Sequence, residues 1–216
     1  MNRIVIVGAG GFGREVLTLI RDINEATPGT WDFHGFIAAD RPDPRLLERI
    51  DARYLGSETD SEVLKSLGDC YFVVAIGNGH VRRRITQDLL RAGLSPATLI
   101  HPSAIIGEDV ELGDGTVICA GSILTTNIRL GHGVQINLLC TIGHDCVLGE
   151  FATLAPGVLV SGNVTLSDEV YMGTNSCTIQ GLSIGTATIV GAGAVVTRSI
   201  EEGLTVVGTP AKPISR

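Results

Sequence analysis

Three residues of the 216-residue sequence have types and spacing that suit acyl transfer. His144 is followed directly by Asp145, and Gly162 lies further along the chain, at a distance of three hexads. A histidine can take a proton from an attacking amine or hydroxyl, and a carboxylate beside it can orient or polarise it. A free backbone N–H can hold the oxyanion of a tetrahedral intermediate. These parts meet only if the chain returns to the same place after every third hexad.

A six-residue repeat supplies that return. From Ile106 to Val196 the first position of each hexad is aliphatic or Met in fifteen of sixteen cases, with Thr178 the exception. A period of six fits neither a helix nor an alternating strand. It is typical of short strands joined by sharp bends, with three hexads to a coil. We therefore predict a parallel β-helix over residues 99–216; the alternative, a glycine-rich β-sandwich, does not keep an unbroken frame of six.

Residues 1–98 follow a different pattern, in which strands alternate with helices. A strand-like run ends in the glycine-rich segment Gly8–Gly13 and leads into a helical pattern of apolar residues. The alternation predicts a small Rossmann-like α/β domain with a parallel sheet. We expect strands over residues 2–7, 33–38 and 71–76, and helices over 16–23, 62–67 and 81–92.

Two glycine turns should meet at the carboxyl edge of that sheet. Gly8–Gly13 fits a dinucleotide fingerprint, in which amides at a helix N-terminus cradle phosphates, and Gly77 ends another strand. The acidic residue that binds the ribose of NAD should follow about 20 positions after the glycines, whereas Asp40 lies clearly beyond that distance from Gly13. The sequence thus favours a nucleotide-linked ligand over NAD, and tight connections without a ligand are the alternative.

Composition and charge exclude several classes of protein. The formal charge of −7 argues against a nucleic-acid partner, and neither a long apolar run nor a signal peptide is evident. Five cysteines without a Cys-x-x-Cys pair fit a reducing cytoplasm better than a disulfide framework. His132 and His144 lie two hexads apart, on different faces of the predicted prism, so we expect no zinc site of the γ-carbonic-anhydrase kind.

The sequence resembles the hexapeptide-repeat sugar acetyltransferases, which include sialic acid O-acetyltransferase and the bacillosamine-type N-acetyltransferases of nucleotide-linked amino sugars. The resemblance rests on Gly8–Gly13, Ile100–Ala104, Gly143–Glu150, Gly173–Ser176 and Val207–Lys212. It implies a left-handed β-helix and a homotrimer. It also implies acetyl-CoA in the groove between adjacent β-helices and a nucleotide sugar on the N-terminal domain.

The resemblance also implies roles for individual residues. His144 would be the general base, Asp145 would raise its basicity, and Asn137 would support the active site. The residues implied for acetyl-CoA are Thr153, Gly162, Thr174 and Ala192, with Lys212 at the CoA phosphates. The residues implied for the nucleotide sugar are Gly10, Gly11, Phe12 and Gly77. The sequence departs from the family at Phe12, at Thr153 and at Ala38-Ala39, where relatives have His, His and paired Asp, so the substrate is less defined than the reaction.

These observations predict a cytoplasmic, acetyl-CoA-dependent N-acetyltransferase that acts on a nucleotide-linked amino sugar in bacterial glycan biosynthesis. The amine would attack the thioester directly, with no metal and no membrane or nucleic-acid partner. Three alternatives stay open: O-acetylation as in sialic acid, an acyl-enzyme at Cys140 or Cys146, and a non-catalytic scaffold that binds sugar nucleotides. The sequence does not distinguish the sugar, the nucleotide or the short acyl donor.

Overall fold

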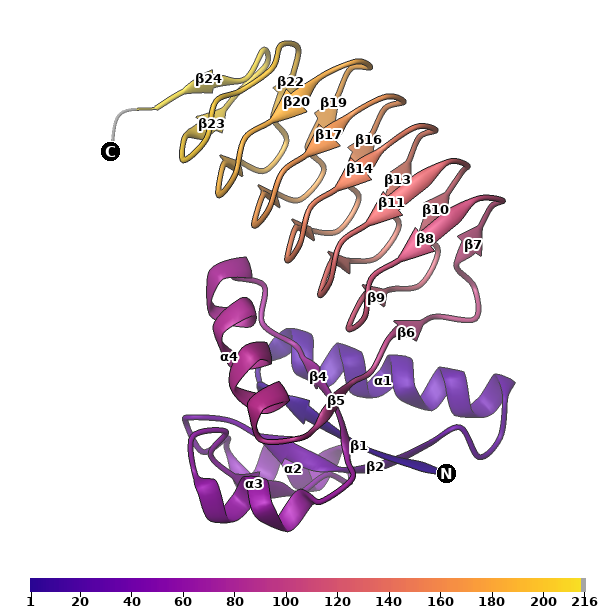
Figure 1. The fold of residues 1–216 in the computed structure, drawn as a ribbon, viewed down its shortest axis with the longest axis vertical. Coiled ribbons are helices and arrows are strands. Elements are labelled where there is room, and N and C mark those ends of the chain that lie inside the picture. Colours follow the sequence, from indigo (N-terminus) through magenta and orange to yellow (C-terminus); the bar gives the residue numbers. More distant parts are fainter. Residues whose placement is uncertain (215–216) are drawn as a thin grey trace. The chain divides into compact units, whose positions relative to one another are not determined.

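The structure is a computed structural model that describes residues 1–214 (Figure 1). The chain divides into two compact units. The first comprises Met1–Gly77 with Val81–Leu99, and the second comprises Asn78–His80 with the chain from Ile100 onward. The predicted β-helix domain extends to residue 216, and residues 215–216 lie outside the described part of the chain.

The first unit is built on a parallel sheet with the strand order β3-β2-β1-β4-β5. Its strands are β1 (Asn2–Val7), β2 (Trp31–Ile37), β3 (Tyr54–Gly56), β4 (Tyr71–Val74) and β5 (Ser95–Pro96). Its helices are α1 (Gly11–Ala26), α2 (Pro44–Arg49), α3 (Ser61–Leu67) and α4 (Gly79–Arg91). The expected α/β alternation is confirmed. The short elements α2 and β3 were not predicted, because six and three residues are too few to show a period.

Packing of α1 on β1 explains the glycines between them. Ile4 to Val7 are fully buried, and α1 buries an apolar stripe that includes Val16 and Ile20. A Cβ on Gly13 would lie 1.9 Å from the carbonyl oxygen of Gly8, so only glycine allows this close approach of helix to strand end. The first turn of α1 therefore begins directly at the carboxyl end of the central strand.

The second unit is a left-handed parallel β-helix, whose stacked coils are visible in Figure 1. Over the described residues its strands form three faces, which we name by their number of strands. The six-stranded face contains β7 (Ile105–Ile106), β10 (Ile123–Leu124), β13 (Thr141–Ile142), β16 (Leu159–Val160), β19 (Cys177–Thr178) and β22 (Val195–Val196). The five-stranded face contains β8 (Val110–Leu112), β11 (Ile128–Leu130), β14 (Val147–Leu148), β17 (Thr165–Leu166) and β20 (Ser183–Ile184). The eight-stranded face contains β6 (Leu99–Ile100), β9 (Val117–Ile118), β12 (Gln135–Ile136), β15 (Thr153–Leu154), β18 (Tyr171–Met172), β21 (Ile189–Val190), β23 (Thr205–Val207) and β24 (Lys212–Pro213).

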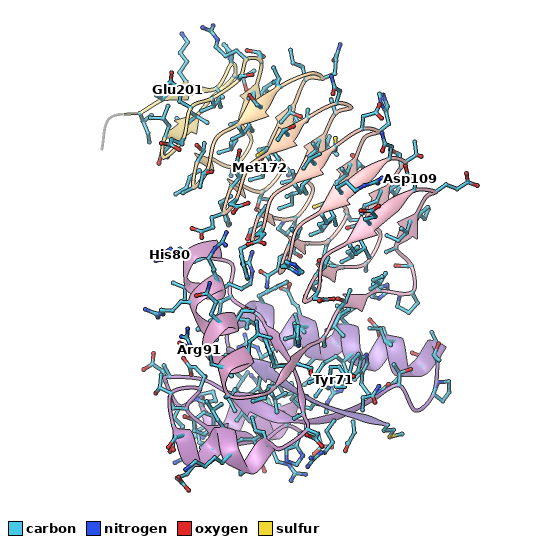
Figure 2. All side chains as sticks on the ribbon, in the orientation of Figure 1. Tyr71, His80, Arg91, Asp109, Met172 and Glu201 are labelled. Carbon is cyan, nitrogen blue, oxygen red and sulfur yellow. The ribbon has the colours of Figure 1, made fainter. Side chains whose placement is uncertain are left out.

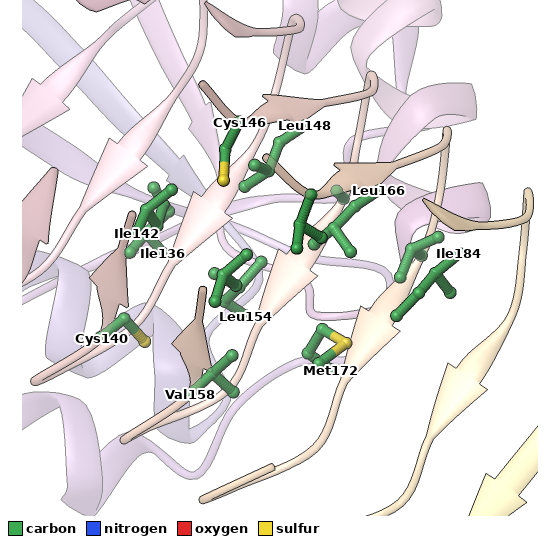
Figure 3. Close-up of a cluster of buried hydrophobic side chains, with 14 of the residues drawn as sticks. Ile136, Cys140, Ile142, Cys146, Leu148, Leu154, Val158, Leu166, Met172 and Ile184 are labelled. Atoms are coloured by element: carbon green, nitrogen blue, oxygen red, sulfur yellow. The ribbon is translucent and has the colours of Figure 1, made fainter. Parts of the chain in front are cut away.

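The predicted coil of three hexads is confirmed by the strand register. Thr141 of β13 pairs with Ile123 one coil earlier and with Leu159 one coil later. First-position residues such as Leu154 and Met172 are fully buried inside the coils (Figures 2 and 3). The interior is thus a continuous column of aliphatic side chains that gives the coils a fixed register.

Candidate active site

The predicted site residues of the β-helix gather at two bends on either side of the six-stranded face. The chain runs from the eight-stranded face through a bend at residues 137–140 to β13, and through a second bend at residues 143–146 to the five-stranded face. We call the column of bends above and below His144 the His144 corner. The other column, which contains Thr174, is the Thr174 corner.

His144 and Asp145 form a hydrogen-bonded pair at the His144 corner. The imidazole Nδ1 lies 2.6 Å from Oδ2 of Asp145, and both side chains are largely exposed. Side chains of consecutive residues can meet here because Asp145 has a left-handed backbone conformation, with φ +60°, which Asp adopts more readily than most residues. An ionised carboxylate only accepts hydrogen bonds, so the pair places the proton on Nδ1 and leaves Nε2 as the basic nitrogen.

Gly162 lies against the imidazole, one coil after His144. The backbone N–H of Asn163 donates to the carbonyl oxygen of His144 at 2.7 Å, which fixes the two coils in register. A Cβ on Gly162 would lie 2.5 Å from Nε2 of His144. Within residues 1–214 the Gly162 N–H has no hydrogen-bond acceptor. The structure therefore brings the predicted base, carboxylate and backbone donor together.

Asn127, one coil before Asp145, is a member of the site that the sequence analysis missed. Its Nδ2 donates to Oδ1 of Asp145 at 2.5 Å. Hydrogen bonds from His144 first, and then from Asn127, hold the pKa of the Asp145 carboxyl below its ordinary value of 3.8. The signal was present in the sequence, because the spacing of three hexads that connects His144 to Gly162 also connects Asp145 back to Asn127.

Asn137, Thr174 and Ala192 lie at the Thr174 corner, and the structure does not bring them to His144 within one chain. The side chain of Asn137 accepts a hydrogen bond from the backbone N–H of Leu138 at 2.7 Å. Thr174 and Ala192 are exposed and stack one coil apart. The six-stranded face separates these residues from the base, so their predicted roles require a partner at that face.

Thr153 and Lys212 lie on the eight-stranded face rather than at either corner. Thr153 of β15 is only 7% exposed and offers little surface to a cofactor. Lys212 is exposed on β24, which pairs antiparallel with Val207 of β23. The predicted contacts of both residues with acetyl-CoA stay predictions.

The buried thiols lack the reactivity that a covalent route requires. Cys140 and Cys146 are fully buried at inward positions of the coils (Figure 3). Burial raises the pKa of the Cys140 thiol to about 11 and also raises the pKa of Cys146. Neither thiol therefore supplies a thiolate near neutral pH, which argues against an acyl-cysteine intermediate.

The predicted phosphate-binding edge of the first unit is open. A Cβ on Gly10, Gly11 or Gly77 would meet no atom within 4 Å. Helix α1 has no side-chain cap at Gly10 and no acidic residue in its first turn, so its first amides are available to an anion. Phe12 is partly buried in the same turn. Arg82, which is 2% exposed, donates to the carbonyl oxygen of Ile76 at 2.6 Å and so holds the turn that ends in Gly77.

The described residues hold neither a cluster of metal-ligating side chains nor a helix that could cross a membrane. Among residues 1–214, no group of three or more His, Cys, Asp or Glu side chains is arranged to hold a metal ion. In the same part of the chain, every helix is too short or too polar to span a bilayer.

Comparison with known proteins finds similarity along the whole chain. Residues 3–89 match the family model described as the PglD N-terminal domain. GDP-perosamine N-acetyltransferase of Escherichia coli O157:H7 is 31% identical over 100% of this chain and 98% of its own length.

Solved structures of sugar N-acetyltransferases are also similar to this chain over its full length. A histidine-to-asparagine variant of perosamine N-acetyltransferase from Caulobacter crescentus, in complex with CoA and GDP-perosamine, is 28% identical with a TM-score of 0.90. That match covers 100% of this chain and 98% of the other. The acetyltransferase domain of PglB from Neisseria gonorrhoeae FA1090, in complex with acetyl coenzyme A, is 30% identical with a TM-score of 0.84, and 99% and 100% of the two chains are covered. With this fold, this pair of residues at the corner and this full-length similarity, the chain belongs to the family of acetyl-CoA-dependent sugar N-acetyltransferases that includes GDP-perosamine N-acetyltransferase.

Proposed function

We propose that this protein transfers the acetyl group of acetyl-CoA to the amino group of a GDP-linked amino sugar of the perosamine class. The single observation that carries the proposal is the His144–Asp145 pair stacked on Gly162, in a chain that is similar over its full length to an enzyme with that substrate. The open glycine edge of the first unit supports a nucleotide-linked acceptor, because free amides at a helix N-terminus favour a pyrophosphate.

The mechanism follows from the roles that these groups can take. The sugar amine attacks the thioester carbonyl carbon, and Nε2 of His144 takes a proton from the amine as the new C–N bond forms. Asp145 stabilises the imidazolium through Nδ1, and the N–H of Gly162 donates to the oxyanion of the tetrahedral intermediate. The C–S bond then breaks, and the proton on Nε2 goes to the leaving thiolate of CoA. Acetyl-CoA and amine thus become amide and free thiol.

The proposed assembly is a homotrimer in which the six-stranded face lies at the interface. Ile105, Leu139, Leu159 and Ile179, on this face or at its two corners, are 42–67% exposed, and apolar surface of this kind marks an interface. A neighbouring copy packed there would bring its Thr174 corner to the His144 corner of the first chain. Asn137, Thr174 and Ala192 could then contribute to the same site as His144.

Light scattering and subunit mixing test this assembly. A trimer of 22.6 kDa chains should scatter as about 68 kDa, and Leu159→Glu should dissociate it and abolish activity. Mixing inactive His144→Ala with inactive Thr174→Arg should restore part of the activity if each site draws on two chains. A fully active monomer, or mixtures that stay inactive although hybrids form, would contradict the shared site.

We also propose that the protein acts in the cytoplasm. None of the five cysteines, all within the described residues, forms a disulfide, which fits a reducing compartment. Acetyl-CoA as the acyl donor is consistent with the same location. Fractionation of cells that express the protein, with the activity followed in each fraction, tests this assignment.

The decisive test of function is release of free CoA thiol from acetyl-CoA against a panel of acceptors. The panel contains GDP-, UDP-, dTDP- and CMP-linked amino sugars, together with free sialic acid. We expect turnover with a GDP-linked amino sugar and an amide in the product by mass spectrometry. Turnover with free sialic acid alone would establish O-acetylation instead, and tight nucleotide-sugar binding without thiol release would establish a non-catalytic scaffold.

A further inference from the structure

We propose that Asn127 is a positioning residue for the general base. It holds the Asp145 carboxylate so that one oxygen stays on Nδ1 of His144 and Nε2 remains the proton acceptor. The inference rests on the proposed acetyl transfer, and it assigns a role to a residue that lies almost a full coil before the histidine in the sequence.

The geometry forms a relay across two coils of the His144 corner. Nδ2 of Asn127 donates to Oδ1 of Asp145 at 2.5 Å, and Oδ2 of the same carboxylate lies 2.6 Å from Nδ1 of His144. The backbone supports the arrangement, because the N–H of Asp145 donates to the carbonyl oxygen of Thr126 at 3.2 Å. Both oxygens of Asp145 are thereby used, one by each neighbour.

The Asp145 carboxylate needs a second hydrogen-bond donor to restrain its rotamer, because its side chain is exposed. About half of its surface is open to water, so a hydrogen bond to His144 alone competes with solvent and with other rotamers. A second bond to the other carboxylate oxygen restricts rotation of the carboxylate and keeps Oδ2 on Nδ1 of the imidazole. The depressed pKa of Asp145, to which both His144 and Asn127 contribute, agrees with two donors on one anion. The effect on catalysis comes from orientation, since the base must face the substrate amine to accept its proton.

Asparagine at position 127 could serve only the backbone conformation, and the experiment must separate that explanation from the positioning role. Asn127 has φ +51°, and Asn is favoured wherever an L-residue adopts the left-handed region. Asn163 supplies the matched control, because it occupies the same corner two coils later with φ +56°. Within the described chain the Asn163 side chain makes no hydrogen bond, and its Nδ2 lies 4.0 Å from the Cβ position of Gly181, on the side away from Asp145.

The experiment compares Asn127→Gly with Asn163→Gly. Glycine adopts a positive φ without strain, so both variants should fold. Each variant removes one side-chain amide from the His144 corner. We expect Asn127→Gly to lower kcat about tenfold with KM for acetyl-CoA unchanged, and Asn163→Gly to stay within about twofold of the wild type. Asn127→Asp, which keeps the size and the left-handed preference but loses the donor, should lower kcat at least as much as Asn127→Gly.

A spectroscopic readout tests the positioning directly. In ¹⁵N NMR the His144 imidazole of the wild type should be mainly the Nδ1–H form, and Asn127→Gly should shift it towards a mixture of both tautomers. Wild-type kcat and tautomer in Asn127→Gly, or equal loss in both glycine variants, would overturn the proposal. The NMR measurement needs no turnover, so failure of every acceptor in the thiol-release assay would reject the proposed function while leaving the test of Asn127 intact.

Discussion

The imidazole of His144 occupies the place that a side chain on Gly162 would take. A Cβ built on Gly162 would lie 2.5 Å from Nε2 and 2.6 Å from Cε1 of the ring, both closer than real Cβ contacts. The coil that carries Gly162 thus packs against the imidazole of the proposed base. Absence of a side chain at this one position allows the ring to lie against Gly162, the residue whose backbone N–H we assign to the oxyanion.

Gly162→Ala should lower kcat by roughly 10²-fold while the protein stays folded, because loss of one aligned donor or base costs that order of rate. The colliding atoms belong to an exposed and rotatable ring, so His144 can swing aside without disturbing the coil. Thermal unfolding and steady-state kinetics measure the two effects. A double-mutant cycle supplies the control, because Gly162→Ala should cost little further activity when His144 is already Ala. Additive losses would contradict a shared geometry.

His144→Ala should lower kcat by about 10²–10⁴-fold with little change in acetyl-CoA binding, since the imidazole moves a proton and does not hold the cofactor. Asp145→Asn should cost less, because Nε2 remains in place although its partner is weaker. Pre-steady-state kinetics and calorimetry with CoA separate the chemical step from binding. Near-normal turnover of His144→Ala at neutral pH would remove the assignment.

Gly11→Val should raise KM for the nucleotide sugar about tenfold or more and leave acetyl-CoA binding intact, because a branched side chain would fill the space where a phosphate must approach the amides of α1. No atom of the protein lies within 4 Å of the Cβ position, so the substitution should not strain the fold. Gly11→Ala should have an intermediate effect. Calorimetry provides the opposing outcome: tight NAD(H) binding without binding of any nucleotide sugar.

Lys212→Ala should raise KM for acetyl-CoA several-fold if this exposed residue of β24 contacts the CoA phosphates. The expected reason is a lost charge-assisted contact, so dephospho-CoA should no longer be a poorer ligand than CoA in the variant. Competition assays with both compounds measure this difference. If the variant still prefers intact CoA to the same degree, Lys212 is a solvated lysine and the phosphates are bound elsewhere.

Stability should fall at alkaline pH partly because of Cys140. Burial raises the pKa of this thiol from 9.0 to about 11. A group with a raised folded pKa stabilises the fold fully below its unfolded pKa and loses that contribution as pH rises towards the folded value. The difference in unfolding free energy between wild type and Cys140→Ala should therefore be constant up to pH 8 and shrink by about 1 kcal/mol at pH 10.

Urea unfolding at pH 7, 8, 9 and 10 measures this difference. Ser122→Ala is the control, because Ser122 is buried in contact with the N–H of Cys140 but does not titrate in this range. The difference in unfolding free energy between Ser122→Ala and the wild type should not change with pH. If the difference between Cys140→Ala and the wild type is equally independent of pH, the thiol ionises alike in the folded and unfolded chains.

The sequence by itself determined the scaffold and the central contact of the candidate site. A six-residue repeat fixes which side chains point inward and which coils lie in register, because both follow from a local period that each hexad repeats. Stacking of Gly162 on His144 needed no more than their spacing of three hexads. The α/β alternation likewise predicted the carboxyl edge where Gly10, Gly11 and Gly77 lie open.

Only the tertiary structure decided how the corner side chains pair. Nothing in the period shows that Asp145 takes a positive φ and turns back to His144, or that Asn127 reaches forward to the same carboxylate, because these contacts depend on one backbone torsion and on individual rotamers. The structure also separated Asn137 from His144 by a whole face. A local repeat determines the position of each residue within its own coil, whereas partners across a corner, or across a second chain, depend on three-dimensional packing.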